Sequence, residues 1–165
     1  MTEENYSQHK RNGERLANQM SLIELVSQMR NSSKAIERLN IKQYNWWNEG
    51  LHGVARAGVA TVFPQAICMA SSFDADAVKR CADIISTEAR AKFNESQQNK
   101  DYSIYKGLTL WSPNINIFRD PRWGRGHETY GEDPYLTSVL GCAFIEGIQG
   151  DNEKYMKGYR VNTYI

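Results

Sequence analysis

Hydrophobic residues recur at helical spacing in two long stretches of the chain. In residues 73–94, where Asp74 or Asp76 can cap the N-terminus, the apolar positions are Val78, Ala82, Ile85, Ala89 and Phe93. The second stretch opens with Asp133 as a cap and Pro134 in the first turn, followed by Leu136, Val139, Leu140, Ala143, Phe144 and Ile148. The pattern predicts two long amphipathic helices.

A third helix is predicted near the N-terminus. Ser21 and Glu24 have the spacing of a capping box, in which the serine hydroxyl accepts the amide hydrogen of Glu24 and the glutamate bonds back to the serine amide. A helix should therefore start at Ser21, with a buried side formed by Leu25, Val26 and Met29. Leu16 and Met20 predict a shorter helix before it. We expect residues 1–40 to form a helical lead-in.

Three segments outside these helices favour extended structure. Residues 44–53 read as a strand that runs into a loop, residues 60–65 as a short extended piece, and residues 107–118 as a β-prone stretch interrupted at Pro113. Residues 94–105 are polar and are expected to lie on the surface. The alternation of strands with helices indicates βαβ units, a parallel sheet and the α/β class.

Composition narrows the range of partners. The 165 residues are 41% hydrophobic, which is ordinary for a globular chain with one core. The formal net charge is +1, so no strong field favours nucleic acid, an anionic membrane or an acidic substrate. The expected partner is a small, neutral molecule.

The cysteines and the N-terminus indicate in which cellular compartment the protein is expected. Cys68, Cys81 and Cys142 are odd in number and widely spaced, which argues for reduced thiols and against a zinc site or a disulfide framework. No apolar signal segment or membrane span is visible, so we expect a cytoplasmic protein. Neither a P-loop nor a G-x-G-x-x-G motif is present, and no metal or cofactor is expected.

Candidate chemistry lies on two loops. The first carries Trp47, Glu49 and His52, and the second is the charged segment of residues 119–133. A neutral sugar offers vicinal hydroxyls and an apolar ring face, so its site needs carboxylates and guanidinium groups beside an aromatic surface. Glu49 can accept hydrogen bonds from two adjacent sugar hydroxyls, and Trp47 can pack on the sugar ring. Arg125 can donate to a hydroxyl while it holds the carboxylate in place.

Structural roles compete with this interpretation. A tryptophan-glutamate motif or an arginine-rich loop is more often a solvated surface with internal ion pairs. We expect Arg119, Asp120 and Arg122 to shape their loop through such pairs, and Asp133 to cap a helix. For His52 a hydrogen-bonded structural role is the commonest outcome, although a ligand or a proton carrier remains an alternative.

Four segments in order resemble the N-terminal domain of glycoside hydrolase family 3, in particular its β-xylosidases and β-glucosidases: YNWWNEGLHG (44–53), ATVFPQAI (60–67), LWSPNINIFRDPRWGRG (110–126) and ETYGEDPYL (128–136). The resemblance implies a TIM-like (β/α)8 barrel, of which this chain would form the first part only. It also implies hydrolysis of terminal β-D-xylosyl or β-D-glucosyl residues with retention of configuration, by two carboxylates roughly 5 Å apart.

Within this resemblance, Glu49 matches the family's carboxylate that binds sugar hydroxyls, and Arg125 matches the arginine beside it. Trp47 lies where its indole would narrow the pocket near the exocyclic carbon and favour xylose. No catalytic residue is assigned in this chain, because the resemblance places the nucleophilic aspartate and the acid/base beyond Ile165.

The resemblance also divides the chain. Residues 41–157 correspond to the first βα units of the barrel, and residues 158–165 form an aberrant or truncated tail that departs from the family pattern. A complete barrel needs about 250 residues, so the isolated chain is expected to be inactive. The alternatives are a carbohydrate-binding or regulatory module without chemistry, and the non-functional product of a truncated gene. The oligomeric state is open.

Overall fold

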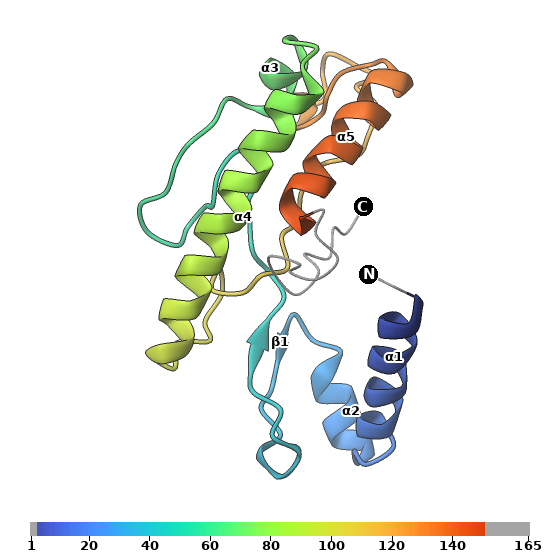
Figure 1. Cartoon of the computed structure of the whole chain (residues 1–165), viewed down its shortest axis with the longest axis vertical. Helices are drawn as coiled ribbons and strands as arrows, with labels where there is room; N and C mark the ends of the chain where they lie inside the picture. The colour runs from blue at the N-terminus through green and yellow to red at the C-terminus, as the bar shows by residue number, and fades with distance from the viewer. Residues whose placement is uncertain (1–2, 151–165) are drawn as a thin grey trace.

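The computed structural model describes residues 3–150, with side chains from residue 7 onward (Figure 1). Its helices are α1 (Glu3–Ala17), α2 (Leu22–Gln28), α3 (Ala66–Ala70), α4 (Ala75–Gln98) and α5 (Pro134–Gln149), with 3-10 turns η1 (Glu37–Leu39) and η2 (Gly126–Glu128). Two short strands, β1 (Ser32–Ser33) and β2 (Tyr44–Asn45), complete the assigned elements.

The two long helices predicted from the sequence are confirmed as α4 and α5. The Asp74 carboxylate accepts a hydrogen bond from the Ala77 amide at 2.8 Å, and Asp133 accepts one from the Leu136 amide at 2.6 Å. Both helices therefore start at a side-chain cap. Helix α4 continues to Gln98, so the first part of the expected surface segment 94–105 is helical, since it contains no glycine or proline to stop the helix.

Helices α4 and α5 lie side by side, and their facing sides form the centre of the core (Figure 1). Val78, Ala82 and Ile85 of α4 are at most 2% exposed, and the main buried residues of α5 are Leu140, Phe144 and Ile148. Leu110, Tyr130 and residues of α3 join the same cluster. In residues 3–150 no helix combines the length and the apolar character that crossing a bilayer requires.

A glycine permits the close approach of these two helices. A Cβ atom placed on Gly147 of α5 would lie 2.4 Å from the Lys79 carbonyl oxygen and 2.6 Å from the Ala82 Cβ, both on α4. Nearby, the buried Ser86 hydroxyl donates to the Ile148 carbonyl at 2.7 Å. The backbone of α5 thus rests directly on α4, and any side chain at position 147 would separate them.

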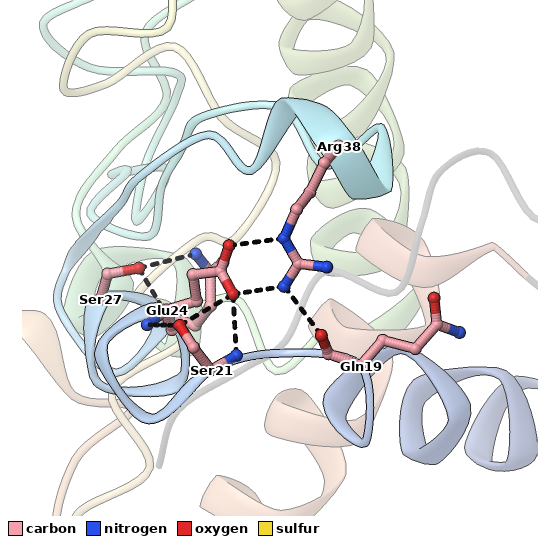
Figure 2. Close-up of polar contacts among 6 residues, drawn as sticks. Gln19, Ser21, Glu24, Ser27 and Arg38 are labelled. Atoms are coloured by element: carbon pink, nitrogen blue, oxygen red, sulfur yellow. Dashed lines mark hydrogen bonds and ion pairs between the residues drawn. The ribbon is translucent and has the colours of Figure 1, made fainter.

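The N-terminal helices lie at the other end of the molecule (Figure 1). The predicted capping box is present, because the Ser21 amide donates to Glu24 Oε2 at 2.8 Å and the Glu24 amide donates to Ser21 Oγ at 3.3 Å. Arg38 of η1 donates to both carboxylate oxygens of Glu24 and to the Gln19 carbonyl (Figure 2). These hydrogen bonds, from Arg38 above all, lower the pKa of Glu24 to about 2.

Two predictions for this region were wrong. Helix α1 has 15 residues and is longer than α2, which has seven. The expected buried side of α2 is exposed, with Val26 at 55% and Met29 at 86%. Polar contacts of Arg38 and Glu24 are instead what the structure shows at the start of α2.

The predicted strands are mostly absent from the part of the chain that the structure describes. The assigned sheet has two strands, and β1 pairs with β2 in antiparallel register. Residues 60–65 form no strand, and residues 107–118 contribute one isolated parallel bridge, between Leu110 and Asn48. A strand requires a neighbour that pairs with it along its length, and the parallel pairing of residues 107–118 with residues 44–53 is limited to the contact at Asn48. The expected parallel sheet of a partial barrel is therefore reduced to one parallel bridge.

Replacing Gly147 with alanine tests the contact between α4 and α5. We expect Gly147→Ala to lower the free energy of unfolding by about 1–3 kcal/mol, because the new methyl group overpacks the helix interface. Urea unfolding followed by circular dichroism measures this change. The matched control is Gly13→Ala on α1, where nothing lies within 4 Å of the added Cβ and no loss is expected. Equal stability of both variants would contradict the close packing described.

Candidate active site

Residues 46–49 are held by a segment that is distant in sequence. The Trp111 amide donates to the Asn48 carbonyl at 2.9 Å, and the Tyr105 amide donates to the Trp47 carbonyl at 3.1 Å. Asn48 is 2% exposed and its side-chain amide donates to the Thr109 carbonyl at 3.1 Å. These bonds fix the backbone of the first candidate loop against residues 105–111.

Trp47 and Glu49 lie together on this loop. The indole Nε1 of Trp47 donates to Glu49 Oε1 at 3.2 Å, although Trp47 is 41% exposed. The Trp47 ring stacks on Trp111, with 5.4 Å between centroids and 22° between planes. The structure therefore places the Glu49 carboxylate at the edge of an exposed aromatic surface, and the sugar-binding roles of Trp47 and Glu49 stay predictions.

The cation nearest to Glu49 is Arg56. Its Nε lies 3.8 Å from Glu49 Oε2, and its guanidinium carbon lies 5.5 Å from the centre of the Tyr105 ring. Arg56 also has a φ of +59°, in the left-handed region that non-glycine residues seldom adopt. The long, solvated ion pair binds Glu49 only weakly, so the carboxylate keeps its capacity to accept hydrogen bonds from a ligand.

Helix α4 anchors the loop that carries Arg56. The amide and the hydroxyl of Thr61 both donate to the Glu88 carboxylate, and these bonds lower the pKa of Glu88. One turn further on, the Lys92 ammonium donates to the Ala57 carbonyl at 3.0 Å and to the Val59 carbonyl at 2.6 Å. Two side chains of α4 thus hold a loop that has no strand of its own.

His52 has a structural role. Its Nε2 lies 3.2 Å from the Gln65 side-chain nitrogen and its Nδ1 lies 3.0 Å from the Phe63 carbonyl oxygen. Because Gln65 donates to Nε2, the hydrogen sits on Nδ1 and is donated to Phe63. Both ring nitrogens are therefore occupied in joining the two ends of this loop, which was the commonest outcome expected from the sequence.

The charged segment forms the predicted local ion pair between Asp120 and Arg122, whereas Arg119 hydrogen-bonds to neutral groups. Arg122 donates to both oxygens of Asp120, at 2.9 and 2.6 Å, and thereby lowers the pKa of that carboxyl. Arg119 donates to the Asn116 side-chain oxygen at 2.7 Å and to the Ile117 carbonyl at 3.1 Å. All three residues shape the backbone of their own loop.

Arg125 immediately precedes η2 and pairs with Glu128. Its Nε and Nη2 donate to the two Glu128 oxygens at 2.8 and 2.6 Å, and the Asn114 side chain donates to Glu128 at 3.3 Å. The hydrogen bonds from Arg125 lower the pKa of Glu128. Within residues 3–150 the Nη1 group of Arg125 has no hydrogen-bond partner, so it remains available to a ligand.

The predicted contact between Arg125 and Glu49 is not formed among the described residues. A carboxylate three positions away in the same turn reaches the guanidinium without closing a long loop, so Glu128 takes the pairing position. The structure thus joins Trp47 with Glu49 and leaves Arg125 in a separate, locally paired unit.

Sequence reasoning missed three side chains at these sites. The spacing of Glu128 three residues after Arg125 was a usable signal. Trp111 and Arg56 gave none, because their contacts depend on the pairing of distant segments and on the course of a loop. In the described part of the chain, no three side chains of the histidine, cysteine, aspartate or glutamate type gather as a metal site.

Comparison with curated relatives points to one family of enzymes. The family model of the glycosyl hydrolase family 3 N terminal domain matches residues 8–158. A xylan 1,4-beta-xylosidase from Xylanibacter ruminicola is 47% identical over 145 residues, and a probable beta-D-xylosidase 7 from Arabidopsis thaliana is 46% identical over 147 residues. These matches cover 86% and 83% of this chain but only 17% and 18% of the two relatives.

Solved structures agree with an α/β fold of the same family. A GH3 exo-beta-xylosidase in complex with a xylobiose aziridine activity-based probe matches with a TM-score of 0.74 and 34% identity, over 90% of this chain and 20% of that one. A Bifidobacterium adolescentis GH3 beta-glucosidase matches with a TM-score of 0.64 and 26% identity, over 80% of this chain and 18% of that one. The chain therefore belongs to glycosyl hydrolase family 3, as part of its N-terminal domain.

Proposed function

We propose that this chain supplies the sugar-binding part of a retaining β-glycosidase, with β-xylosides as its preferred substrates and β-glucosides second. The observation that carries the proposal is the exposed Trp47 indole bonded at its edge to Glu49. A pyranose presents an apolar face to such an indole, while its hydroxyls point sideways and donate hydrogen bonds to the carboxylate. Neutral sugars are recognised through this combination, and it requires no metal or cofactor.

The state of Glu49 supports this role. Its carboxylate is bonded to the Trp47 nitrogen through one oxygen, while its other oxygen has Arg56 at 3.8 Å. Sugar hydroxyls arriving from solvent can therefore bond to Glu49 without breaking a strong ion pair, and the Trp47 nitrogen limits rotation of the carboxylate.

We assign Arg125 to the same sugar. Glu128 holds the guanidinium by two of its nitrogens, which directs the unpaired Nη1 as a hydrogen-bond donor. The charge of Arg125 is balanced by Glu128, so it suits a neutral hydroxyl better than an anionic group. In this proposal Arg125 and Glu49 bind different hydroxyls and need not touch.

The preference for xylose follows from Trp47. A bulky indole beside the sugar restricts the space for the exocyclic CH2OH that glucose carries and xylose lacks, and one such group is worth about tenfold or more in discrimination. The curated relatives with the highest similarity described above carry β-xylosidase names, whereas the solved structures include both specificities. The bulk of Trp47 and the names of these curated relatives support β-xylosides as the substrate class.

The remainder of the enzyme lies outside this sequence in our proposal. The chain spans 17–20% of the length of the relatives and structures described above. We place the nucleophilic aspartate and the acid/base in segments that follow residue 165, and interpret residues 41–157 as the first βα units of a TIM-like barrel. The parallel bridge between Asn48 and Leu110, on either side of α4, supports this interpretation because it joins two successive strand positions of such a barrel.

Replacing the carboxylate tests the sugar contact. The test uses the longer polypeptide that our proposal implies, called here the full-length polypeptide, in which this chain is followed by the catalytic segments. There we expect Glu49→Gln to lower kcat/KM for nitrophenyl β-xyloside about 10- to 100-fold, since a hydrogen bond to a charged group contributes about 1.5–3 kcal/mol. The matched control is Glu146→Gln on α5, where the exposed Glu146 pairs with Lys79 of α4. Equal kcat/KM for Glu49→Gln and the unaltered protein would refute the assignment of Glu49.

Trp47→Ala tests the specificity. With the indole removed, we expect the ratio of kcat/KM for nitrophenyl β-xyloside over nitrophenyl β-glucoside to fall about tenfold, because the larger sugar is no longer excluded. Steady-state kinetics on both substrates measure the ratio. An unchanged ratio would mean that another group selects the sugar.

The Arg125–Glu128 pair gives a pH prediction. The pKa of Glu128 lies below its ordinary value of 4.5, so its stabilising contribution is complete above that value and disappears as the pH falls through the lowered pKa. Relative to Glu128→Gln, the unaltered chain should be more stable at pH 7 by no more than about 1 kcal/mol, since Arg125 is 68% exposed. Thermal unfolding between pH 7 and pH 3 should show this advantage shrinking. A constant difference would exclude the pair as its source.

The isolated chain of 165 residues should not hydrolyse nitrophenyl β-xyloside. Family members need two carboxylates for the chemistry, and we assign neither to this chain. The measurement is release of nitrophenol by the purified polypeptide, with the full-length polypeptide as a positive control. Turnover by the isolated chain would contradict the assignment, and xylose binding without turnover in either polypeptide would favour a carbohydrate-binding module.

A further inference from the structure

We propose that Trp111 is a positioning residue for sugar selection: it holds the Trp47 indole in place and, through that indole, the Glu49 carboxylate. The inference rests on the proposed function, since it concerns the same sugar site. It adds a residue from a distant segment that does not need to touch the substrate.

Trp111 is bonded to the residues on both sides of Trp47. Its backbone amide donates to the Asn48 carbonyl at 2.9 Å, and its indole Nε1 donates to the Trp46 carbonyl at 2.8 Å. The neighbouring Leu110 is 1% exposed and makes the parallel bridge to Asn48. Both ends of the Trp111 residue are therefore fixed relative to the peptide that carries Trp47.

The ring of Trp47 depends on this support. Its backbone is held by the Asn45 side chain, which accepts from the Trp47 amide at 2.9 Å, and by the Tyr105 amide, which donates to the Trp47 carbonyl at 3.1 Å. These contacts fix the backbone but not the side-chain torsions. The ring itself is 41% exposed and stacks on Trp111 at 5.4 Å. Stacking on an indole that is itself held by a hydrogen bond to the Trp46 carbonyl favours one rotamer among those open to a half-exposed tryptophan.

The rotamer of Trp47 also sets the direction of Glu49. With the ring in its observed plane, Nε1 donates to Glu49 Oε1 at 3.2 Å. If Trp47 turned, the wall that restricts the exocyclic group and the donor that orients the carboxylate would move together. Trp111 thus couples sugar selection to the strand pairing between Asn48 and Leu110.

Substitutions at position 111 test the inference in the full-length polypeptide, with nitrophenyl β-xyloside and β-glucoside as substrates. We expect Trp111→Leu, which removes the stacked ring, to lower the xyloside-over-glucoside ratio of kcat/KM about tenfold, as Trp47→Ala does. Trp111→Phe keeps a stacked ring and loses the hydrogen bond to Trp46, so it should retain most of the preference. Tyr135→Leu, at a 78% exposed aromatic on α5, is the control and should leave the ratio unchanged.

A spectroscopic measurement separates this role from general loss of structure. Two stacked indoles produce a coupled circular-dichroism signal, which should disappear in Trp47→Phe and Trp111→Leu and persist in Tyr135→Leu. Absence of the signal in the unaltered protein would overturn the inference.

The kinetic outcomes distinguish this inference from the proposed function. If Trp47→Ala changes the sugar preference and Trp111→Leu does not, the inference is wrong and the proposed function stands. If neither changes it, both the inference and the assignment of Trp47 fail, while Glu49→Gln still tests the sugar site independently.

Discussion

The hydrogen bonds of Asn48 join the two segments on which the candidate site depends. Its side-chain nitrogen donates to the carbonyls of Asn45 and Thr109, its side-chain oxygen accepts from the Gly107 amide at 2.6 Å, and its own carbonyl accepts from the Trp111 amide. Asn48 is 2% exposed, so losing any of these partners would leave a buried polar group unsatisfied. Asn48 thus joins the segment that carries Trp47 and Glu49 to the segment that carries Trp111, through its side chain and its backbone carbonyl.

Close approach at Gly107 is part of the same constraint. A Cβ atom there would lie 2.7 Å from both the Asn45 carbonyl oxygen and the Asn48 side-chain nitrogen. Between the paired segments the chain passes through α4, which supplies the hydrophobic face for the core and, through Glu88 and Lys92, the anchors for the loop with Arg56. A single helix therefore connects the strand positions and supports the loop next to Glu49.

The features predictable from the sequence were local ones. The caps at Ser21, Asp74 and Asp133 involve partners three residues away, and the buried faces of α4 and α5 follow a fixed helical period. The exposed face of α2 was mispredicted because its amphipathic pattern says which residues can be buried, not what is present to cover them. The extended segments failed for a related reason, since a strand is defined by its partner: residues 44–53 gave only the two-residue strand β2 and isolated bridges, and residues 107–118 gave only the bridge between Leu110 and Asn48.

The same distinction between local and long-range contacts explains which parts of the candidate site were predicted from the sequence. Trp47 and Glu49 were identified because they are two residues apart on one loop, and the motif carries both the carboxylate and the aromatic ring. The pairing of Arg125 with Glu128 was within reach of a local rule, whereas the stack of Trp47 on Trp111 joins two segments that are far apart in the sequence and are held together by hydrogen bonds such as those of Asn48. A resemblance to the family indicates which residue types bind sugar, but it does not say which neighbours hold them.

The two candidate sugar contacts also differ in how they are held, and this follows from their chemistry. A guanidinium has five donors in one plane, so Glu128 can bind Nε and Nη2 of Arg125 and still leave Nη1 for a hydroxyl. A carboxylate held in the same way by a guanidinium would have one acceptor site on each oxygen already occupied. Glu49 instead has one donor from Trp47 and a cation at 3.8 Å, which orient it without saturating its oxygens. Lysine at position 125 would therefore not be equivalent, because a single ammonium bound to Glu128 presents no planar array that fixes the direction of its remaining hydrogens.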